Sequence, residues 1–197
     1  MKSNVARFYW SQLGVPHRAL DLGCADGQLG RYRPIGTEIH GLELQPELVE
    51  KAEGYATVRQ WDLDTPAPLP FPDDHFDAVI AKDILEHLQK PWVLVREIRR
   101  VLRPGGVVMA SVISSRSHRV WADYTHVRGF THDTGRQLFA DAGFSVERVW
   151  RMGPVPGSAR LNAIRFVPYV LACPPFNWLW FSSWEIRAVR PSNGQPK

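Results

Sequence analysis

The sequence predicts an α/β fold in which helices cover both faces of a mostly parallel sheet of seven strands. Two observations support this prediction. Short apolar runs alternate along the chain with stretches whose apolar residues recur every three or four positions. Turns rich in glycine and proline separate these segments, and a regular alternation of strand and helix favours parallel strands.

Four strands are expected in the first half of the chain, at residues 18–22, 40–44, 58–63 and 76–81. A helix is expected after the second strand, because Pro46 suits a first helical turn. The proline-rich segment 65–72 predicts a loop. Residues 76–81 are almost continuously apolar, as expected of a strand whose two faces are both covered.

In the second half, helical spacing of apolar residues over 84–102 predicts a long helix that ends at Arg103-Pro104-Gly105-Gly106. A strand is expected over 107–113, followed by a polar loop to about residue 130. Thr131 is expected to cap a helix that Gly143 closes. Alternating apolar residues predict the last two strands, at 144–150 and 184–190.

Length and composition favour one globular domain, expected to span residues 1–197. The chain is 44% hydrophobic and 22% charged, which argues against wholesale disorder. Its 2 cysteines, Cys24 and Cys173, lie far apart, which disfavours a disulfide scaffold and a zinc ribbon. The N-terminus lacks the apolar core of a signal peptide, so a cytoplasmic setting is expected.

Residues 153–182 are predicted to form an apolar, basic insertion between the last two strands. Prolines interrupt its longest apolar stretch, which is shorter than the ~20 residues of a membrane-spanning helix. From residue 151 onward, six basic side chains oppose Glu185 alone. Either these arginines are solvated around a hydrophobic lid, or the surface faces an anionic substrate or membrane headgroups. The second interpretation predicts peripheral contact through 166–184 at the inner face of a membrane.

Polar elements follow four successive strands, at the sheet edge where ligands bind in such folds. The small residues of segment 21–27 allow a ligand to approach the backbone. Glu43 can accept hydrogen bonds from two ribose hydroxyls, and Asp62 from an adenine amino group. Segment 82–87 follows the fourth strand. Each element alone is an ordinary polar strand end, but their joint order is far more specific.

These motifs resemble those of the class I S-adenosylmethionine-dependent methyltransferases. The pattern D-x-G-x-G-x-G is present at 21–27 with Ala25 as its middle residue, Phe-Asp-x-Val at 76–79, and Glu-His-Leu at 86–88. Segment 97–106 is similar to the family's E-x-x-R-V-L-x-P-G-G with one residue more before Val101. The resemblance covers about residues 17–152 and the final strand. It implies a Rossmann-like sheet whose last strand is antiparallel.

The resemblance also implies that S-adenosyl-L-methionine (SAM) is the cofactor. A dinucleotide is disfavoured, because Ala25 and Gln28 stand where G-x-G-x-x-G requires glycines. The residues expected to hold SAM are Asp21, Gly23, Cys24, Ala25, Gly27, Glu43, Leu44, Asp62, Leu63, Lys82, Asp83 and His87.

Segment 118–131 looks like a motif of methyltransferases encoded among bacterial polysaccharide and glycan genes. His126 and Asp123 are the candidates to deprotonate an acceptor hydroxyl, since histidine titrates near neutrality. Alternatively, His126 is a packed or capping residue. The candidates to bind a phosphate or carboxylate of the acceptor are Arg116, Arg119 and Arg128.

Metal binding by the polar residues of this region is not expected, because their spacing matches no standard zinc signature. The residues weighed for it are His118, Asp123, His126, His132 and Asp133.

The leading hypothesis is a SAM-dependent O-methyltransferase acting on a sugar, a glycan or a lipid-linked acceptor, as in polysaccharide biosynthesis. Two alternatives remain: a methyltransferase of a small metabolite or quinone, and a non-catalytic SAM-binding scaffold, which Ala25 and a short first helix would permit. No nucleic-acid partner is expected, because the chain lacks an Asn/Asp-Pro-Pro-Tyr motif and its basic excess is small. The oligomeric state stays open.

Overall fold

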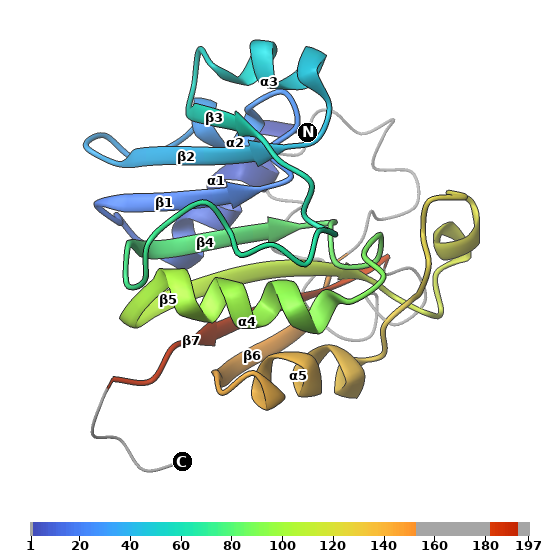
Figure 1. Cartoon of the computed structure of the whole chain (residues 1–197). Coiled ribbons are helices and arrows are strands. Elements are labelled where there is room, and N and C mark those ends of the chain that lie inside the picture. Colours follow the sequence, from blue (N-terminus) through green and yellow to red (C-terminus); the bar gives the residue numbers. More distant parts are fainter. Residues whose placement is uncertain (1, 153–181, 193–197) are drawn as a thin grey trace.

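A computed structural model describes residues 2–152 and 182–192 (Figure 1). They contain a seven-stranded sheet of order β3-β2-β1-β4-β5-β7-β6. The strands are β1 (Arg18–Leu22), β2 (Glu38–Glu43), β3 (Thr57–Gln60), β4 (Phe76–Lys82), β5 (Leu102–Ile113), β6 (Ser145–Met152) and β7 (Ser183–Val189). Only β7 runs antiparallel to its neighbours β5 and β6. The predicted mostly parallel, Rossmann-like sheet with an antiparallel last strand is therefore confirmed.

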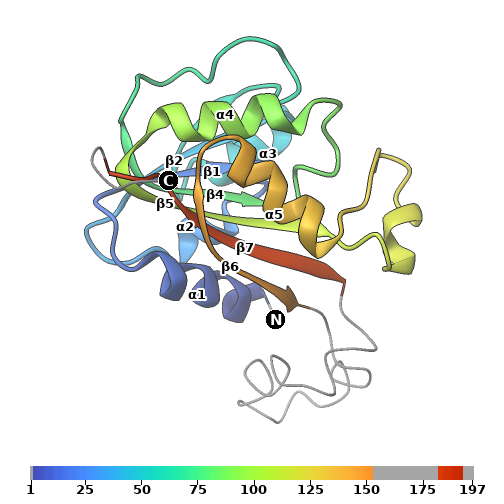
Figure 2. The same ribbon diagram turned by 90° about the horizontal axis from the view of Figure 1, so that it is seen from below.

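Helices cover both faces of this sheet, as predicted. They are α1 (Lys2–Leu13), α2 (Gln28–Arg31), α3 (Pro46–Ala52), α4 (Pro91–Val101) and α5 (His132–Asp141), and a short 3-10 helix η1 spans His118–Trp121. Helices α1 and α2 lie on one face, and α4 and α5 lie on the other (Figure 2).

The central strands are buried on both faces, because each face packs against its own helical layer. In β4, Val79 packs with the apolar residues under α4 and α5, whereas Ile80 packs with Tyr9 and Trp10 of α1. This alternation follows from the two-residue period of a strand. The result is a well-packed platform whose carboxyl edge carries the loops between elements.

Helix α1 was not predicted, although it closes one face of the core. The hydroxyl of Tyr9 donates a 2.6 Å hydrogen bond to Oε2 of Glu185, and Nε1 of Trp10 donates to the carbonyl of Leu29 at 2.9 Å. The buried residues of α1, Ala6, Tyr9 and Trp10, are few and are interspersed with polar residues in the sequence. The periodic signal was therefore weak.

The helix predicted over 84–102 was too long. Residues 84–90 form turns, and α4 begins only at Pro91. A residue before proline avoids the helical region, and Lys90 accordingly has φ −129° and ψ 66°. Ile84 and Leu88 still face the core, which is why their spacing imitated a continuing helix.

Two strand boundaries differ most from prediction. Strand β3 ends at Gln60, so Asp62 lies beyond it rather than at its end. Strand β5 begins at Leu102, which pairs with Phe76 of β4, and the register then shifts so that Ala78 pairs with Val107; Gly105, between them, has a φ of 80°. There, the amide of Gly105 donates to the carbonyl of Arg190, and the amide of Arg190 donates to the carbonyl of Gly106.

The predicted ends of α5 are confirmed. Thr131 accepts a hydrogen bond from the amide of Thr134, whose hydroxyl accepts in return from the amide of Thr131. Gly143 closes the helix with a φ of 86°.

Most of the predicted insertion at 153–182, and of the surface 166–184, lies outside the described residues. Within residues 2–152 and 182–192, none of the helices is long and apolar enough to cross a bilayer. That residues 1–197 form one domain stays a prediction.

Burial of Glu185 predicts a pH-dependent stability. Burial raises the pKa of this carboxyl from its usual value near 4.5 to about 7. From about pH 5 to 7 the folded protein therefore retains a proton that the unfolded chain has released. Stability is greater below this range and falls as pH rises through it, by up to roughly 3 kcal/mol from this group. Urea unfolding at a series of pH values measures the slope.

In the Glu185→Gln variant, the unfolding free energy is expected to lose this contribution to its pH dependence, because an amide does not titrate. Glu50→Gln is the control, since Glu50 is an exposed carboxylate on α3. An identical slope in Glu185→Gln and the natural protein would contradict the prediction.

Candidate active site

The candidate site lies at the carboxyl edge of the parallel strands. The arrowheads of β1, β2, β4 and β5 point the same way, so the loops that follow them gather on one side of the molecule (Figure 1). The chain leaves β1 toward β2 on one side, whereas β4 and β5 lie on the other. Ligands of doubly wound sheets bind at such a switch point.

The loop after β1 is held in a tight, left-handed path. The amides of Gly23 and Cys24 both donate to the carbonyl of Leu42, at 2.8 and 3.1 Å. Gly23 has a φ of 70°, and a Cβ built on it would lie 2.8 Å from Cδ1 of Ile84. Ala25 also has a positive φ, of 47°, so the loop keeps its shape without a glycine at the middle position of the motif.

Glu43 joins this loop to the start of α3. Its buried carboxylate accepts hydrogen bonds from the amides of Ala25 (3.0 Å), Leu44 (2.8 Å) and Gln45 (3.0 Å). Its oxygens thus fix the relative position of the loops after β1 and β2. A carboxylate oxygen accepts more than one hydrogen bond, so Glu43 retains capacity for a ligand hydroxyl.

Asp21 and Cys24 are buried behind the loop. Burial raises the pKa of Asp21 to about 7, although Lys82 opposes the shift. Cys24 packs against Gly41, where a Cβ would come within 2.7 Å of its Sγ. Burial raises the pKa of the Cys24 thiol well above its usual range, so Cys24 is a packing residue rather than a nucleophile.

At the end of β4, Asp83 connects two strands. It forms an ion pair with Lys82 and accepts a 2.5 Å hydrogen bond from the hydroxyl of Ser111 on β5. Asp83 has a positive φ of 52°, which turns the chain sharply after the strand. Sequence reasoning missed Ser111, because nothing in β5 distinguishes it from other small residues.

The predicted adenine contacts lie further out. Asp62 is exposed, and its Oδ1 accepts from the amide of Asp64 at 2.9 Å, so it shapes a turn. Leu44 is exposed after β2, and Leu63 is half-buried against the core. The structure therefore brings Asp21, Gly23, Glu43 and Asp83 to the strand ends.

Residues 114–130 form a loop with a closed neck. The amide of Ser115 donates to the carbonyl of Phe130, and the amide of Phe130 donates to the carbonyl of Ile113, both at 2.8 Å. Beyond the neck the loop projects from the sheet (Figure 1). Trp121 is 75% exposed and Tyr124 is 98% exposed on this loop.

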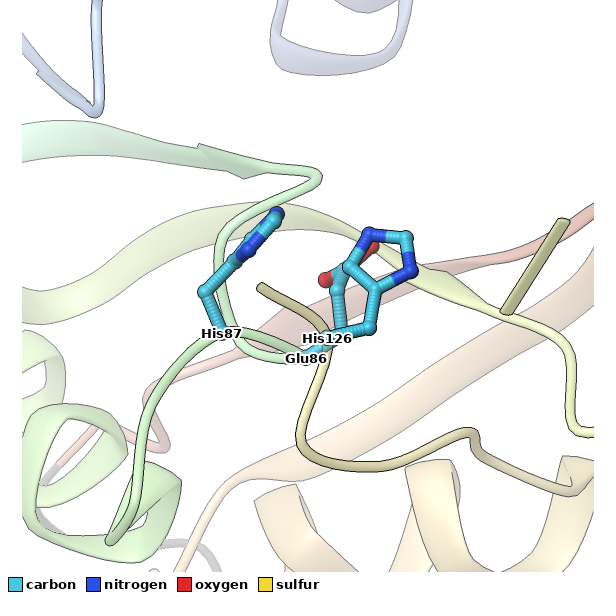
Figure 3. Close-up of side chains that lie close together, drawn as sticks. All are labelled: Glu86, His87 and His126. Carbon is cyan, nitrogen blue, oxygen red and sulfur yellow. The ribbon is translucent and has the colours of Figure 1, made fainter. Parts of the chain in front are cut away.

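Glu86, His87 and His126 come together between this loop and the turn after β4 (Figure 3). Their candidate ligand atoms lie within 4.8 Å of one another, and the two imidazole rings are 4.6 Å apart between centroids. Glu86 is 1% exposed, and burial raises its pKa to about 8. The amide of Val127 donates to the carbonyl of Glu86 at 3.0 Å, which fastens the loop to the turn.

Hydrogen bonds orient both imidazoles. Nδ1 of His126 lies 3.0 Å from the carbonyl oxygen of Val120, and Nδ1 of His87 lies 2.9 Å from the hydroxyl of Thr125. That hydroxyl donates to Oδ1 of Asp123 at 2.6 Å. Since a carbonyl only accepts, His126 carries its proton on Nδ1 when neutral, and its Nε2 lone pair is left for a ligand.

The remaining predicted residues differ in their surroundings. Asp123 is exposed and connects with His87 through Thr125 rather than with His126. Arg128 donates to the carbonyl of Gln89 at 2.8 Å, whereas Arg116 and Arg119 are exposed. His132 pairs with Asp133 at the start of α5, so the five-residue metal set weighed from the sequence is not the set that gathers here.

Comparison with known proteins agrees with this geometry. Residues 20–110 match the sequence profile of the family described as "Methyltransferase domain". The chain is 36% identical over 106 residues to an uncharacterized methyltransferase of Schizosaccharomyces pombe, covering 46% of this chain and 38% of that one. It is 32% identical to the norajmaline N-methyltransferase of Rauvolfia serpentina, covering 58% and 41%.

A third relative is the ubiquinone biosynthesis O-methyltransferase of Xanthomonas oryzae, at 31% identity, covering 49% of this chain and 43% of that one. The chain thus spans less than half the length of these curated relatives.

Among solved structures, a SAM-dependent methyltransferase from Archaeoglobus fulgidus shares the fold with a TM-score of 0.74 and 19% identity, covering 96% of this chain and 94% of that one. The [4+2]-cyclase SpnF shares it with a TM-score of 0.71 and 22% identity, covering 97% and 82%. Profile, relatives and fold agree with the glycine loop and the strand-end acids: residues 20–110 are similar to a methyltransferase domain, and the chain shares the fold of SAM-dependent methyltransferases.

Proposed function

We propose that this protein transfers the methyl group of SAM to a hydroxyl oxygen of a small acceptor. The observation that carries the proposal is the set of buried acids at the carboxyl edge, Asp21, Glu43 and Glu86, beside which Lys82 is already paired with Asp83. Such a site favours a ligand with cationic centres, and SAM has a sulfonium and an ammonium.

The donor set suits the parts of SAM. In this proposal, Glu43 accepts from the ribose hydroxyls, the backbone of segment 23–27 lies against the methionine part, and Asp21 faces its ammonium. Leu44 and Leu63 pack against the adenine, and Asp62 accepts from its amino group. Lys82 and Asp83 lie beside the cofactor at the end of β4.

When bound, SAM supplies a methyl group that is already activated on sulfur. The chain itself supplies alignment and a proton acceptor, and both lower the barrier. His126 receives the acceptor's hydroxyl proton at Nε2, because its Nδ1 is occupied by the carbonyl of Val120. Asp123 acts through Thr125 on the neighbouring His87.

We further propose a sugar, glycan or lipid-linked molecule as the acceptor. The projecting loop offers Trp121 and Tyr124 as exposed aromatic surfaces for a ring, and Arg116 and Arg119 for a phosphate or carboxylate. Incubation of the protein with isotope-labelled SAM and cell extracts, followed by mass spectrometry, identifies the methylated product. Accumulation of S-adenosylhomocysteine only when sugars or lipid-linked glycans are added supports the proposal. A labelled quinone or metabolite would replace this acceptor class, and no turnover would favour a scaffold.

The Glu43→Ala variant is expected to bind SAM at least tenfold more weakly. A hydrogen bond to a charged acceptor contributes about 1.5–3 kcal/mol, and the change also releases the amides of Ala25 and Leu44. Calorimetry with SAM measures the affinity. Glu38→Ala is the control, because Glu38 lies at the opposite end of β2. Unchanged affinity in Glu43→Ala would remove Glu43 from the cofactor site.

The Gly23→Val variant is expected to fold and to lose SAM binding. A valine there must adopt a φ of 70° and meets Ile84. Gly14→Val is a matched control, since Gly14 has a φ of 75° but nothing within 4 Å of its added Cβ. Both variants carry the backbone strain, so a thermal shift with SAM in Gly14→Val alone supports the placement. A shift of equal size in both would contradict it.

The His126→Ala variant is expected to lower kcat by ~10²-fold or more while sparing SAM affinity, because it removes the proton acceptor. Asp123→Ala is expected to have a smaller effect, since two hydrogen bonds separate Asp123 from His87. Steady-state kinetics with the identified acceptor measures both. A lower melting temperature with unchanged kcat would show that His126 is a packing residue.

A further inference from the structure

We propose that Glu86, His87 and His126 bind a divalent transition-metal cation, for which Zn²⁺ is the best chemical match, and that this cation holds the acceptor's oxygen. Cation binding itself follows from the side chains. Its role in catalysis rests on the proposed function above.

The donors form a mixed set from two segments. Glu86 and His87 come from the turn after β4, and His126 comes from the loop after β5 (Figure 3). One oxygen and two nitrogens lie within 4.8 Å of one another, so small side-chain rotations would bring all three onto one ion. Two histidines and one glutamate with a further open position are a set found in catalytic zinc sites.

Both histidines already have the outer partners that metal-binding histidines use. A ligand imidazole usually donates its other ring N–H to a carbonyl or a carboxylate, which fixes its tautomer. His126 has the carbonyl of Val120 at 3.0 Å from Nδ1. His87 has the hydroxyl of Thr125, which passes the hydrogen bond to Asp123. In both rings this arrangement leaves Nε2 as the ligand atom.

Glu86 provides independent evidence for a ligand. It is 1% exposed, and its Oε2 has no hydrogen-bond partner among the residues that the structure describes. A buried polar atom without a partner is costly. The amide of Val127 donates a hydrogen bond to the carbonyl of Glu86, and this bond keeps Oε2 of Glu86 near the imidazole of His126. A cation between them would satisfy the carboxylate.

The cation would take over the activation of the acceptor. A hydroxyl coordinated at the open position loses its proton to solvent more readily. Its oxygen lone pair then forms the O–C bond while the C–S bond breaks, and that electron pair remains on sulfur. His126 in this case holds the cation rather than the proton, so activity depends on the metal.

Titration of the chelator-treated protein with Co²⁺ and Zn²⁺ tests the cation site directly. Bound Co²⁺ is expected to develop visible absorption bands, which Zn²⁺ should abolish by competition. His126→Ala and Glu86→Gln are expected to weaken Zn²⁺ binding at least 100-fold. His132→Ala, which removes a histidine outside the cluster, should leave it unchanged. No Co²⁺ spectrum in the natural protein, or equal affinity in all three variants, would overturn the proposal.

Thr125→Val tests the outer partners without touching a ligand. It keeps the size of the side chain and breaks the hydrogen bond to His87, so Zn²⁺ affinity should fall about tenfold. This variant keeps all three ligands, so the test does not depend on whether Glu86→Gln folds. Unchanged affinity would show that the proposed orientation of His87 is wrong.

Calorimetry with S-adenosylhomocysteine on the metal-free protein separates the two proposals. Cofactor binding without any metal affinity would overturn the cation site and leave the proposed methyl transfer standing. Metal binding without cofactor binding would overturn the proposed methyl transfer and leave the cation site standing. Where both bind, chelator should abolish turnover and Zn²⁺ should restore it, whereas full turnover in chelator would assign activation to a free imidazole.

Discussion

The carboxylate of Glu43 is the interaction on which the arrangement of the site depends. It accepts hydrogen bonds from amides of the loop after β1 and of the start of α3. These bonds connect two segments that the sheet alone leaves independent. A second connection comes from the amides of Gly23 and Cys24, which both donate hydrogen bonds to the carbonyl of Leu42. The left-handed conformations of Gly23 and Ala25 follow from this geometry, because the chain must turn back within a few residues.

Charge at the strand ends is the second organising feature. Asp21, Glu86 and Glu185 are all buried, and burial raises the pKa of each above its usual value. Lys82 is a nearby cation, but it is paired with Asp83. Burying these carboxylates in their ionised form costs free energy, and a bound cationic ligand can offset that cost. Binding of such a ligand therefore also stabilises the fold.

The order of elements could be predicted because strands and helices alternate with clear turn signals. Periodicity also misled: Ile84 and Leu88 imitate helical spacing from within turns, and only Pro91 marks the true start of α4. The strand-end residues Gly23, Glu43 and Asp83 could be located from the motif order. The contact of Tyr9 with Glu185 could not, because 176 positions separate them and neither has a local signature.

The histidine cluster shows a similar limit. Glu86 and His87 are adjacent in the sequence, but His126 joins them only because the loop after β5 folds back onto the turn after β4. The set weighed from the sequence joined His126 with His118, Asp123, His132 and Asp133, and His132 instead pairs with its neighbour Asp133. Where a loop folds back depends on long-range contacts, which local sequence patterns do not reveal.

The closed neck of the 114–130 loop bears on how such a protein diversifies. Its two ends are joined by main-chain hydrogen bonds between residues 113–115 and 130, which are nearly independent of side-chain identity. Gly129 is the exception, because a Cβ there would lie 2.7 Å from Cα of Ser115. Residues beyond the neck, such as Trp121 and Tyr124, can therefore be exchanged without altering the sheet or the loop after β1. Under the proposed function, acceptor preference and cofactor retention would then be separable traits, free to drift at different rates under selection.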